Sequence, residues 1–441
     1  MSLYDHYLAA QGQVSTDSRQ PQPGTLFFAL NGPSFRGADF AAAALASGAR
    51  HAVVDDAALA AQDAARYTYA PDPLVALQAL AQEHRRHFRG PVLAVTGSNG
   101  KTTTKELLMV VLAEKYQVLA TTGNLNNHIG VPLTLLRLRP SQHEVAVIEM
   151  GANHRGEIAD YCRWAEPTHG LITNIGKAHL EGFGGEEGIA LGKGELFDYL
   201  AAHGGTLFVN TLDARLPGVA AHAVQAHAAG AAPVLATYPG PADTYPAALL
   251  AANPALHLRL AGGTEVAAQL TGDYNFSNLA AAAAVGTYFD VPAPQIAAAL
   301  AAYNPQNNRS QLLLTAGGND LILDAYNANP SSMAAALRSF AARPVAAGQQ
   351  RVAILGDMFE LGAESPREHA ELGQLLAGLS LDAVVLIGSD MRHAAAACQA
   401  ARYFPSKEAA AAWLAQHPAT GSLVLLKGSR GMGLETLLPL L

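Results

Sequence analysis

The sequence predicts an α/β protein made of three domains with mostly parallel sheets. Short apolar runs bounded by turn residues alternate almost throughout with segments of helical spacing, a pattern typical of layered α/β units. The chain has 441 residues, which is too long for one ordinary hydrophobic core and fits about three domains of typical size. We therefore expect three successive α/β units.

The first unit is small. Two apolar runs, 24–30 and 51–56, flank a helical stretch and read as strands. Gly90 and Pro91 then interrupt a longer helical pattern. We expect this domain to cover residues 1–88.

The second unit contains four strands that look buried and that each end in a polar residue. They are 92–96, 145–149, 170–174 and 206–210, ending at Thr96, Glu149, Asn174 and Asn210. In an open parallel sheet, ligands bind outside the carboxyl ends of the strands. The four polar residues are therefore predicted to face one crevice.

The third unit repeats this pattern with strands at 321–325, 351–357, 383–388 and 422–427, which end at or next to a polar or glycine position. Turn formers cluster at 303–309 and mark the boundary, so the second domain should cover 89–305 and the third 306–441. Alanine-rich tracts carry Leu, Ile and Tyr at helical spacing, which predicts close-packed helices.

Composition narrows the class of protein. The formal net charge is −8, so no general attraction to nucleic acid or anionic membranes is expected. Cys162 and Cys398 lie far apart in helix-like stretches, which favours a reducing cytoplasm over a disulfide framework. The N-terminus lacks the pattern of a signal peptide, and no apolar run has the length of a membrane helix. We expect a soluble, cytoplasmic, monomeric protein.

The segment VTGSNGKTTTKE at 95–106 predicts a phosphate site. It joins the strand 92–96 to a helical pattern, and its glycines allow backbone N–H groups to turn towards an anion at the helix N-terminus. Lys101 would add a point charge, and the Thr102 hydroxyl could reach magnesium. An ordinary turn with a capping threonine is the alternative. The loop is shorter than the usual G-x-x-x-x-G-K-[ST] signature.

Other polar residues fall near the same crevice. Glu149 closes its strand and could bind magnesium or simply cap a helix. His179 follows another strand end in NIGKAHLEGFG, where a packed or solvent-facing histidine is the alternative. The amide-rich segment 121–132 suits recognition of a polar substrate, or forms a plain turn.

The segment 186–200 predicts a helix. Its buried stripe would be formed by Ile189, Leu196 and Phe197. Lys193 lies off this stripe, as a solvated lysine would.

At this point the sequence resembles the Mur ligase family. The matching motifs, in chain order, are VTGSNGKTTTKE, GNLNNHIGVPLTLLRL, VIEMGANHRGEIA, ITNIGKAHLEGFG, DAYNANPSSM, AILGDMFELG and LLKGSRGMGLE, and the N-terminal STDSRQPQPGTLFFAL also matches. The resemblance spans essentially the whole chain. GNLNNHIGVP and DAYNANP point, within the family, to the enzymes that add D-alanyl-D-alanine to UDP-N-acetylmuramoyl-tripeptide.

The resemblance implies an N-terminal UDP-binding domain, a central ATP-binding P-loop domain and a C-terminal Rossmann-like domain. It implies an ADP-forming ligase of peptidoglycan synthesis that uses ATP and two Mg²⁺ ions and forms an acyl phosphate. Two readings compete: another amide ligase of the Mur or folylpolyglutamate type, and a nucleotide-dependent binding ATPase. The first would differ in its third-domain pocket, and the second would leave the amide-rich loop unexplained.

The resemblance also assigns roles to individual residues. The nucleotide would be bound by Gly97, Ser98, Asn99, Gly100, Lys101, Thr102, Thr103, Asn278, Arg309 and Asp324. Magnesium would be held by Thr102, Glu149, His179 and a carbamylated Lys193. The catalytic set would be Lys101, His179, Lys193 and Asn327. The sequence departs from the family pattern at Gly192, Tyr274 and Asn308, where relatives commonly have alanine, histidine and glycine.

Overall fold

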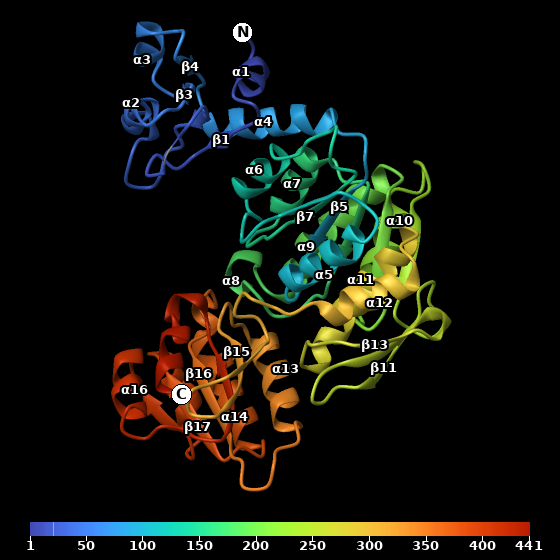
Figure 1. The fold of residues 1–441 in the computed structure, drawn as a ribbon, viewed down its shortest axis with the longest axis vertical. Helices are drawn as coiled ribbons and strands as arrows, with labels where there is room; N and C mark the ends of the chain where they lie inside the picture. The colour runs from blue at the N-terminus through green and yellow to red at the C-terminus, as the bar shows by residue number, and fades with distance from the viewer. Residues whose placement is uncertain (21) are drawn as a thin grey trace.

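The protein is described by a computed structural model that covers residues 1–20 and 22–441. Three α/β units follow one another along the long axis of the molecule, with the N-terminal unit at one end and the C-terminal unit at the other (Figure 1). The predicted α/β class with mostly parallel sheets is confirmed. Among the residues described, no helix has both the length and the apolarity needed to cross a membrane.

The first unit has a four-stranded sheet in the order β1-β2-β3-β4, and all its neighbours are parallel. Its strands are β1 Val14–Ser15, β2 Leu26–Phe28, β3 His51–Val54 and β4 Tyr67–Tyr69. Its helices are α1 Leu3–Ala9, α2 Ala41–Ala46 and α3 Ala57–Gln62. Strands β2 and β3 are the two apolar runs predicted from the sequence; β2 is shorter than predicted at both ends, and β3 only at its C-terminal end.

Helix α4, Pro73–Arg86, connects the first unit to the second. The Asp72 side chain accepts hydrogen bonds at its N-terminus, and proline occupies its first position, where no backbone donor is needed. At its other end His84 lies 2.9 Å from the Leu138 carbonyl, while Tyr7 donates to the Leu136 carbonyl at 2.7 Å. These buried contacts attach the first unit to the second.

The second unit has a six-stranded parallel sheet in the order β10-β9-β8-β5-β7-β6. Its strands are β5 Val92–Thr96, β6 Val118–Ala120, β7 Val145–Glu149, β8 His169–Ile172, β9 Thr206–Asn210 and β10 Val234–Tyr238. Three of the four predicted strands have the predicted bounds. The fourth, β8, begins one residue earlier and ends at Ile172, so Asn174 lies in the loop beyond it.

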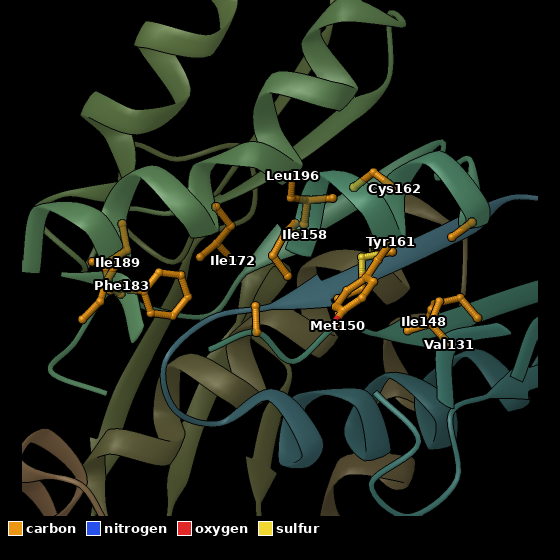
Figure 2. Close-up of a cluster of buried hydrophobic side chains, with 14 of the residues drawn as sticks. Val131, Ile148, Met150, Ile158, Tyr161, Cys162, Ile172, Phe183, Ile189 and Leu196 are labelled. Atoms are coloured by element: carbon orange, nitrogen blue, oxygen red, sulfur yellow. The ribbon is translucent and has the colours of Figure 1, made fainter. Parts of the chain in front are cut away.

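Helices cover both faces of this sheet. They are α5 Lys101–Ala113, α6 Gly130–Leu135, α7 Glu157–Ala165, α8 Leu180–Phe183, α9 Glu186–Ala202, α10 Leu216–Ala226, α11 Phe276–Tyr288 and α12 Ala293–Ala302. Ile148 of β7 packs with side chains of α6, α7 and α9 (Figure 2), whereas its neighbour Val147 packs in the layer of α5 and α11. Alternate residues thus enter opposite cores, which explains why these strands are continuously apolar.

A small antiparallel sheet, β11-β12-β13, lies beside α11 and α12. Its strands are β11 Ala247–Ala251, β12 His257–Leu260 and β13 Glu265–Ala267. The alanine-rich tracts form α11 and α12, as predicted. At Gly286 of α11 an added Cβ would lie 2.5 Å from Val111 of α5, so small residues allow these helices to pack closely.

The third unit has a six-stranded sheet in the order β14-β15-β19-β16-β17-β18, in which only the pair β14 and β15 is antiparallel. Its strands are β14 Gln311–Leu314, β15 Asp320–Asp324, β16 Arg351–Gly356, β17 Ala383–Ile387, β18 Arg402–Phe404 and β19 Leu423–Lys427. Its helices are α13 Pro330–Ala341, α14 Ser365–Ala377, α15 Met391–Ala397 and α16 Lys407–Leu414. All four predicted strands are present.

Candidate functional site

A cavity of about 940 Å³ lies at the carboxyl ends of the central strands and is also lined by residues of the third unit. Residues predicted for the site in the second domain and in the third domain both contribute to it. The predicted residues that line it are Ser98, Asn99, Gly100, Lys101, Thr102, Thr103, Glu149, Asn174, His179, Asn210, Asn278, Arg309, Asp324 and Asn327.

Thr96 does not face this cavity, contrary to the prediction. Its side chain is fully buried, and its hydroxyl donates to the Met150 carbonyl at 2.7 Å. A strand alternates its side chains between two faces, so the last residue of β5 points inward and the loop after it carries the site.

The predicted phosphate loop has the required backbone shape. Gly97 and Gly100 have φ angles of 137° and 79°, a region that favours glycine. The loop is attached to the end of β8, because the Ser98 and Asn99 amides donate to Asn174 at 3.0 Å. An added Cβ on Gly97 would lie 2.0 Å from the Thr173 hydroxyl oxygen. Helix α5 then begins at Lys101 and directs its N-terminus at the cavity.

Lys101 is held by the loop that it follows. Its Nζ donates to the carbonyls of Gly97 at 2.7 Å and Ser98 at 3.0 Å. Burial lowers the pKa of Lys101 to about 8, and the charge of Arg309 contributes to this lowering while Glu149 opposes it. Near pH 8, Lys101 is therefore present in both its charged and its neutral form.

Glu149 is a buried carboxylate in which one oxygen accepts hydrogen bonds and the other, among the residues described, has no partner. Its Oε1 accepts from Asn126 Nδ2 at 2.7 Å and from the Thr102 hydroxyl at 3.1 Å. The side chain of Glu149 is buried, and among the residues described its Oε2 has no hydrogen-bond partner. A buried unpaired carboxylate oxygen beside a hydroxyl matches the oxygen ligands that magnesium prefers. Asn126 comes from the amide-rich loop.

His179 lies at the N-terminus of α8 with a φ of 54°. Its Nδ1 contacts the carboxylate of Glu360, which belongs to the third unit. No group of three or more His, Cys, Asp or Glu side chains is arranged as a metal site in the described part of the chain. The structure thus brings His179 and Glu149 to the same cavity without uniting them in one ligand cluster.

Lys193 is buried rather than solvated, which corrects the interpretation drawn from helical spacing. Its side chain is 1% exposed, its Nζ donates to the Ala152 carbonyl at 3.0 Å, and it lies 4.9 Å from the centroid of the Phe183 ring. Burial, reinforced by the charge of Lys101, lowers the pKa of Lys193 far below its ordinary value. Lys193 lies behind the wall of the cavity, which Ala152 helps to form.

The reason for this error is that α9 is enclosed on more than one side. The expected stripe of Ile189, Leu196 and Phe197 is fully buried, but α8 also packs against α9. An added Cβ on Gly192 would lie 2.5 Å from the Phe183 ring. The glycine that departs from the family pattern therefore makes room for Phe183 beside Lys193.

The third unit contributes an ion pair that the sequence did not reveal. Asp324 and Lys427 are directly opposite on β15 and β19, and Lys427 Nζ lies 2.6 Å from Asp324 Oδ2. The same Nζ donates to the Asn327 carbonyl at 3.2 Å. The only signal in the sequence was that a predicted strand ended at Lys427. Arg309 stacks on Tyr326, with its guanidinium carbon 3.8 Å from the ring centroid.

Asn278 and Tyr274 link the cavity wall to neighbouring elements. Asn278 Oδ1 accepts from the Thr104 hydroxyl of α5 at 3.1 Å, and its Nδ2 donates to Asn275 at 2.8 Å. The Tyr274 hydroxyl lies 3.0 Å from the Ser310 hydroxyl, next to Arg309. Tyrosine at this position thus connects the central unit to the segment that carries Arg309.

Comparison with known proteins gives a consistent result. Three family models match successive parts of the chain: "Mur ligase family, catalytic domain" over 12–87, "Mur ligase middle domain" over 95–286, and "Mur ligase, glutamate ligase domain" over 308–430. Two relatives named UDP-N-acetylmuramoyl-tripeptide--D-alanyl-D-alanine ligase are 32% identical (Bacillus subtilis, 96% of this chain and 91% of the relative) and 34% identical (Escherichia coli, 96% and 92%).

Solved structures agree. MurF from Acinetobacter baumannii is 32% identical and superimposes with a TM-score of 0.85 over 98% of this chain and 96% of that one. MurF ligase from Thermotoga maritima, solved in complex with ADP, is 25% identical with a TM-score of 0.83 over 100% and 98% of the two chains. The match in sequence, domain order and three-dimensional structure covers nearly the whole chain, and the protein belongs to the Mur ligase family.

Proposed function

We propose that this protein is an ATP-dependent, ADP-forming ligase that joins D-alanyl-D-alanine to the terminal carboxylate of UDP-N-acetylmuramoyl-tripeptide. The observation that carries the proposal is a phosphate loop facing third-unit cations across one cavity, in a chain similar over 96% of its length to ligases named for this reaction. The substrates are those printed in the names of these relatives. Peptidoglycan precursor synthesis is the process that such a product serves.

In this proposal each of the three domains has its own binding role. Residues 1–88 would bind the UDP sugar, 89–305 would bind ATP, and 306–441 would complete the site from the other side. The separate sheets of the three units support this division. The buried free thiols of Cys162 and Cys398 suit a reducing compartment such as the cytoplasm.

The proposed chemistry begins with attack of the tripeptide carboxylate on the γ-phosphorus of ATP. ADP leaves and an acyl phosphate forms. The neutral amine of the dipeptide then attacks the carbonyl carbon of the acyl phosphate, and phosphate leaves with the proton that the nitrogen loses. Two unit charges about 4 Å apart repel by roughly 4 kcal/mol at an effective dielectric of 20. Lys101 and Arg309, which both line the cavity, would offset this repulsion, and exclusion of water by the bound substrates would protect the acyl phosphate.

The loop residues Gly97 to Thr103 would surround the phosphates, with Asn278 on the adenine side and Asp324 reaching the ATP from the third domain. Thr102 and Glu149 would hold one magnesium ion, which fits the open carboxylate oxygen, and His179 would serve a second. Bound magnesium would neutralise part of the phosphate charge. Asn327 would lie near the reaction centre.

Lys193 would be carbamylated in this proposal. The reaction with carbon dioxide requires a neutral amine, and burial favours that form of Lys193. The Nζ of Lys193 contacts the carbonyl of Ala152, a residue that lines the cavity, so the new carboxylate would lie next to the cavity wall. Mass measurement of the intact protein in bicarbonate buffer would test for the modification.

The test of function is phosphate release from ATP with magnesium and UDP-N-acetylmuramoyl-tripeptide, with and without D-alanyl-D-alanine, while product mass is measured in parallel. Release that depends on the dipeptide and yields the pentapeptide is expected. Lys101→Ala should abolish ligation with the fold intact, whereas Lys115→Ala, an exposed lysine just after the same helix, should not. Release that is indifferent to the dipeptide would contradict the proposal.

A further inference from the structure

The loop between β8 and α8 carries a lysine that has no role in the proposed function. Lys177 Nζ lies 3.0 Å from Glu368 Oε1 and 3.7 Å from Glu371 Oε2, and both carboxylates belong to α14 of the third unit. In the described part of the chain, Lys177 is the only lysine or arginine of the second unit that forms an ion pair with the third unit. Neither Lys177 nor Glu368 is among the described residues that line the cavity. The pair therefore joins the two units outside the candidate site.

One partner of this pair is buried. The Glu368 side chain is 1% exposed and that of Lys177 is 30% exposed. Arg367, also on α14, contacts the same oxygen of Glu368 at 3.0 Å. An ion pair between two exposed side chains contributes little, whereas a buried carboxylate depends on its partners. If the third unit moved away from the second, Glu368 would keep Arg367 and lose Lys177.

Further contacts place this pair where the third unit meets the phosphate loop. The backbone N–H of Lys177 donates to Ser331 Oγ at 2.8 Å, at the start of α13. At the same helix end, Asn329 Nδ2 donates to Asn99 Oδ1 of the phosphate loop at 2.8 Å. Helix α8 packs against the 3-10 helix Gly362–Glu364 of the third unit, at the boundary between the two units (Figure 1). The segment that carries Lys177 is thus part of the contact between the units.

We propose that Lys177 and Glu368 are positioning residues that hold the third unit over the phosphate loop during ligation. Their role in ligation rests on the proposed function. Arg309 and Asp324 line the cavity from the third unit, so they can act together with Lys101 only while the two units are in contact. Because the ion pair forms only in that arrangement, it stabilises the arrangement relative to one in which the units are apart.

The first test removes the charge of Lys177. Lys177→Met should lower kcat/KM for pentapeptide formation by about 3- to 10-fold, between the effects of exposed ion pairs and of buried hydrogen bonds to charged groups. The reason is that kcat/KM falls by the same factor as the population of enzyme whose two units are in contact. Lys177→Arg keeps the charge and should retain most of the activity. The fold of the third unit should not suffer, because Glu368 retains Arg367.

A double variant separates the ion pair from other effects of each substitution. Glu368→Gln should cause a loss of similar size, and Lys177→Met combined with Glu368→Gln should lose little more than either variant alone. Arg259→Met is a matched control, because Arg259 pairs with Glu265 at 2.9 Å within the small antiparallel sheet and not between units. It should behave as the unmodified enzyme.

Small-angle X-ray scattering with magnesium and ADP measures the separation of the units without turnover. Lys177→Met should have a larger radius of gyration than the unmodified enzyme, whereas Arg259→Met should not. An unchanged radius of gyration or an undiminished kcat/KM in Lys177→Met would overturn the inference, and so would strictly additive losses in the double variant. If the unmodified enzyme makes no pentapeptide, the proposed function itself fails, while the scattering comparison still tests whether the pair holds the units together.

Discussion

Nucleotide binding should be accompanied by proton uptake at Lys101. The pKa of this lysine is about 8 in the protein without nucleotide, so about half of its side chains are neutral at pH 8. A polyphosphate beside the ammonium favours the charged form and raises its pKa. We therefore expect uptake of a fraction of a proton per nucleotide near pH 8, less at pH 7 and more at pH 9.

The direction of the pH dependence follows from the same shift. Because the pKa of Lys101 in the free protein, about 8, lies below its ordinary value, the contribution of Lys101 to nucleotide affinity should fall as the pH rises above 8. The stability of the free protein should change in the opposite direction. The unfolded chain binds more protons than the folded one between about pH 8 and pH 10.5, so this lysine's unfavourable contribution to stability is lost as the pH rises through that interval.

Isothermal titration calorimetry with ADP and magnesium measures the uptake. ADP avoids turnover, and binding enthalpies in two buffers of different ionisation enthalpy give the number of protons at each pH. The control is Lys101→Arg, whose guanidinium stays charged at every pH tested. This variant should retain binding but show no uptake near pH 8. The same uptake in both proteins would mean that another group titrates, and it would refute the reasoning.

Three further predictions concern contacts that cross between elements. Lys427→Met removes the partner of the Asp324 carboxylate and should reduce the free energy of unfolding of the third unit by about 3–5 kcal/mol, measured by denaturant unfolding. The double variant Lys427→Met, Asp324→Asn should recover part of this stability. Strictly additive losses would contradict coupling between the two side chains. The Glu106 carboxylate accepts hydrogen bonds from the Tyr303 hydroxyl at 2.6 Å and from Asn307 Nδ2 at 2.8 Å. Glu106→Gln should therefore lower hydrogen-exchange protection in the segment leading to Arg309. Unchanged protection would contradict a role of Glu106 in holding this segment. His179→Ala should weaken the dependence of turnover on magnesium, whereas an unchanged magnesium titration would remove His179 from the metal site.

Local sequence determined much of the fold and half of the candidate site. The strands 92–96, 145–149 and 206–210 were predicted to the residue, because a strand buried on both faces is apolar throughout and stops where polar residues begin. The phosphate loop was also readable, since Gly97 and Gly100 supply its backbone shape within six consecutive residues. Strands and loops whose shape depends on residues close together in the chain can therefore be predicted from the sequence alone.

Tertiary structure decided the features that depend on partners distant in the chain. Helical spacing placed Lys193 in solvent, but packing of α8 over α9 buried it. Asn126 reaches Glu149 from a loop 23 residues away, and Lys427 reaches Asp324 across 103 residues. No local pattern encodes such pairs, because they form only when separate strands and loops are brought together by packing of the apolar core. The sequence by itself therefore determined the elements, the phosphate loop and the family, while the fold decided which charges are buried and which are paired.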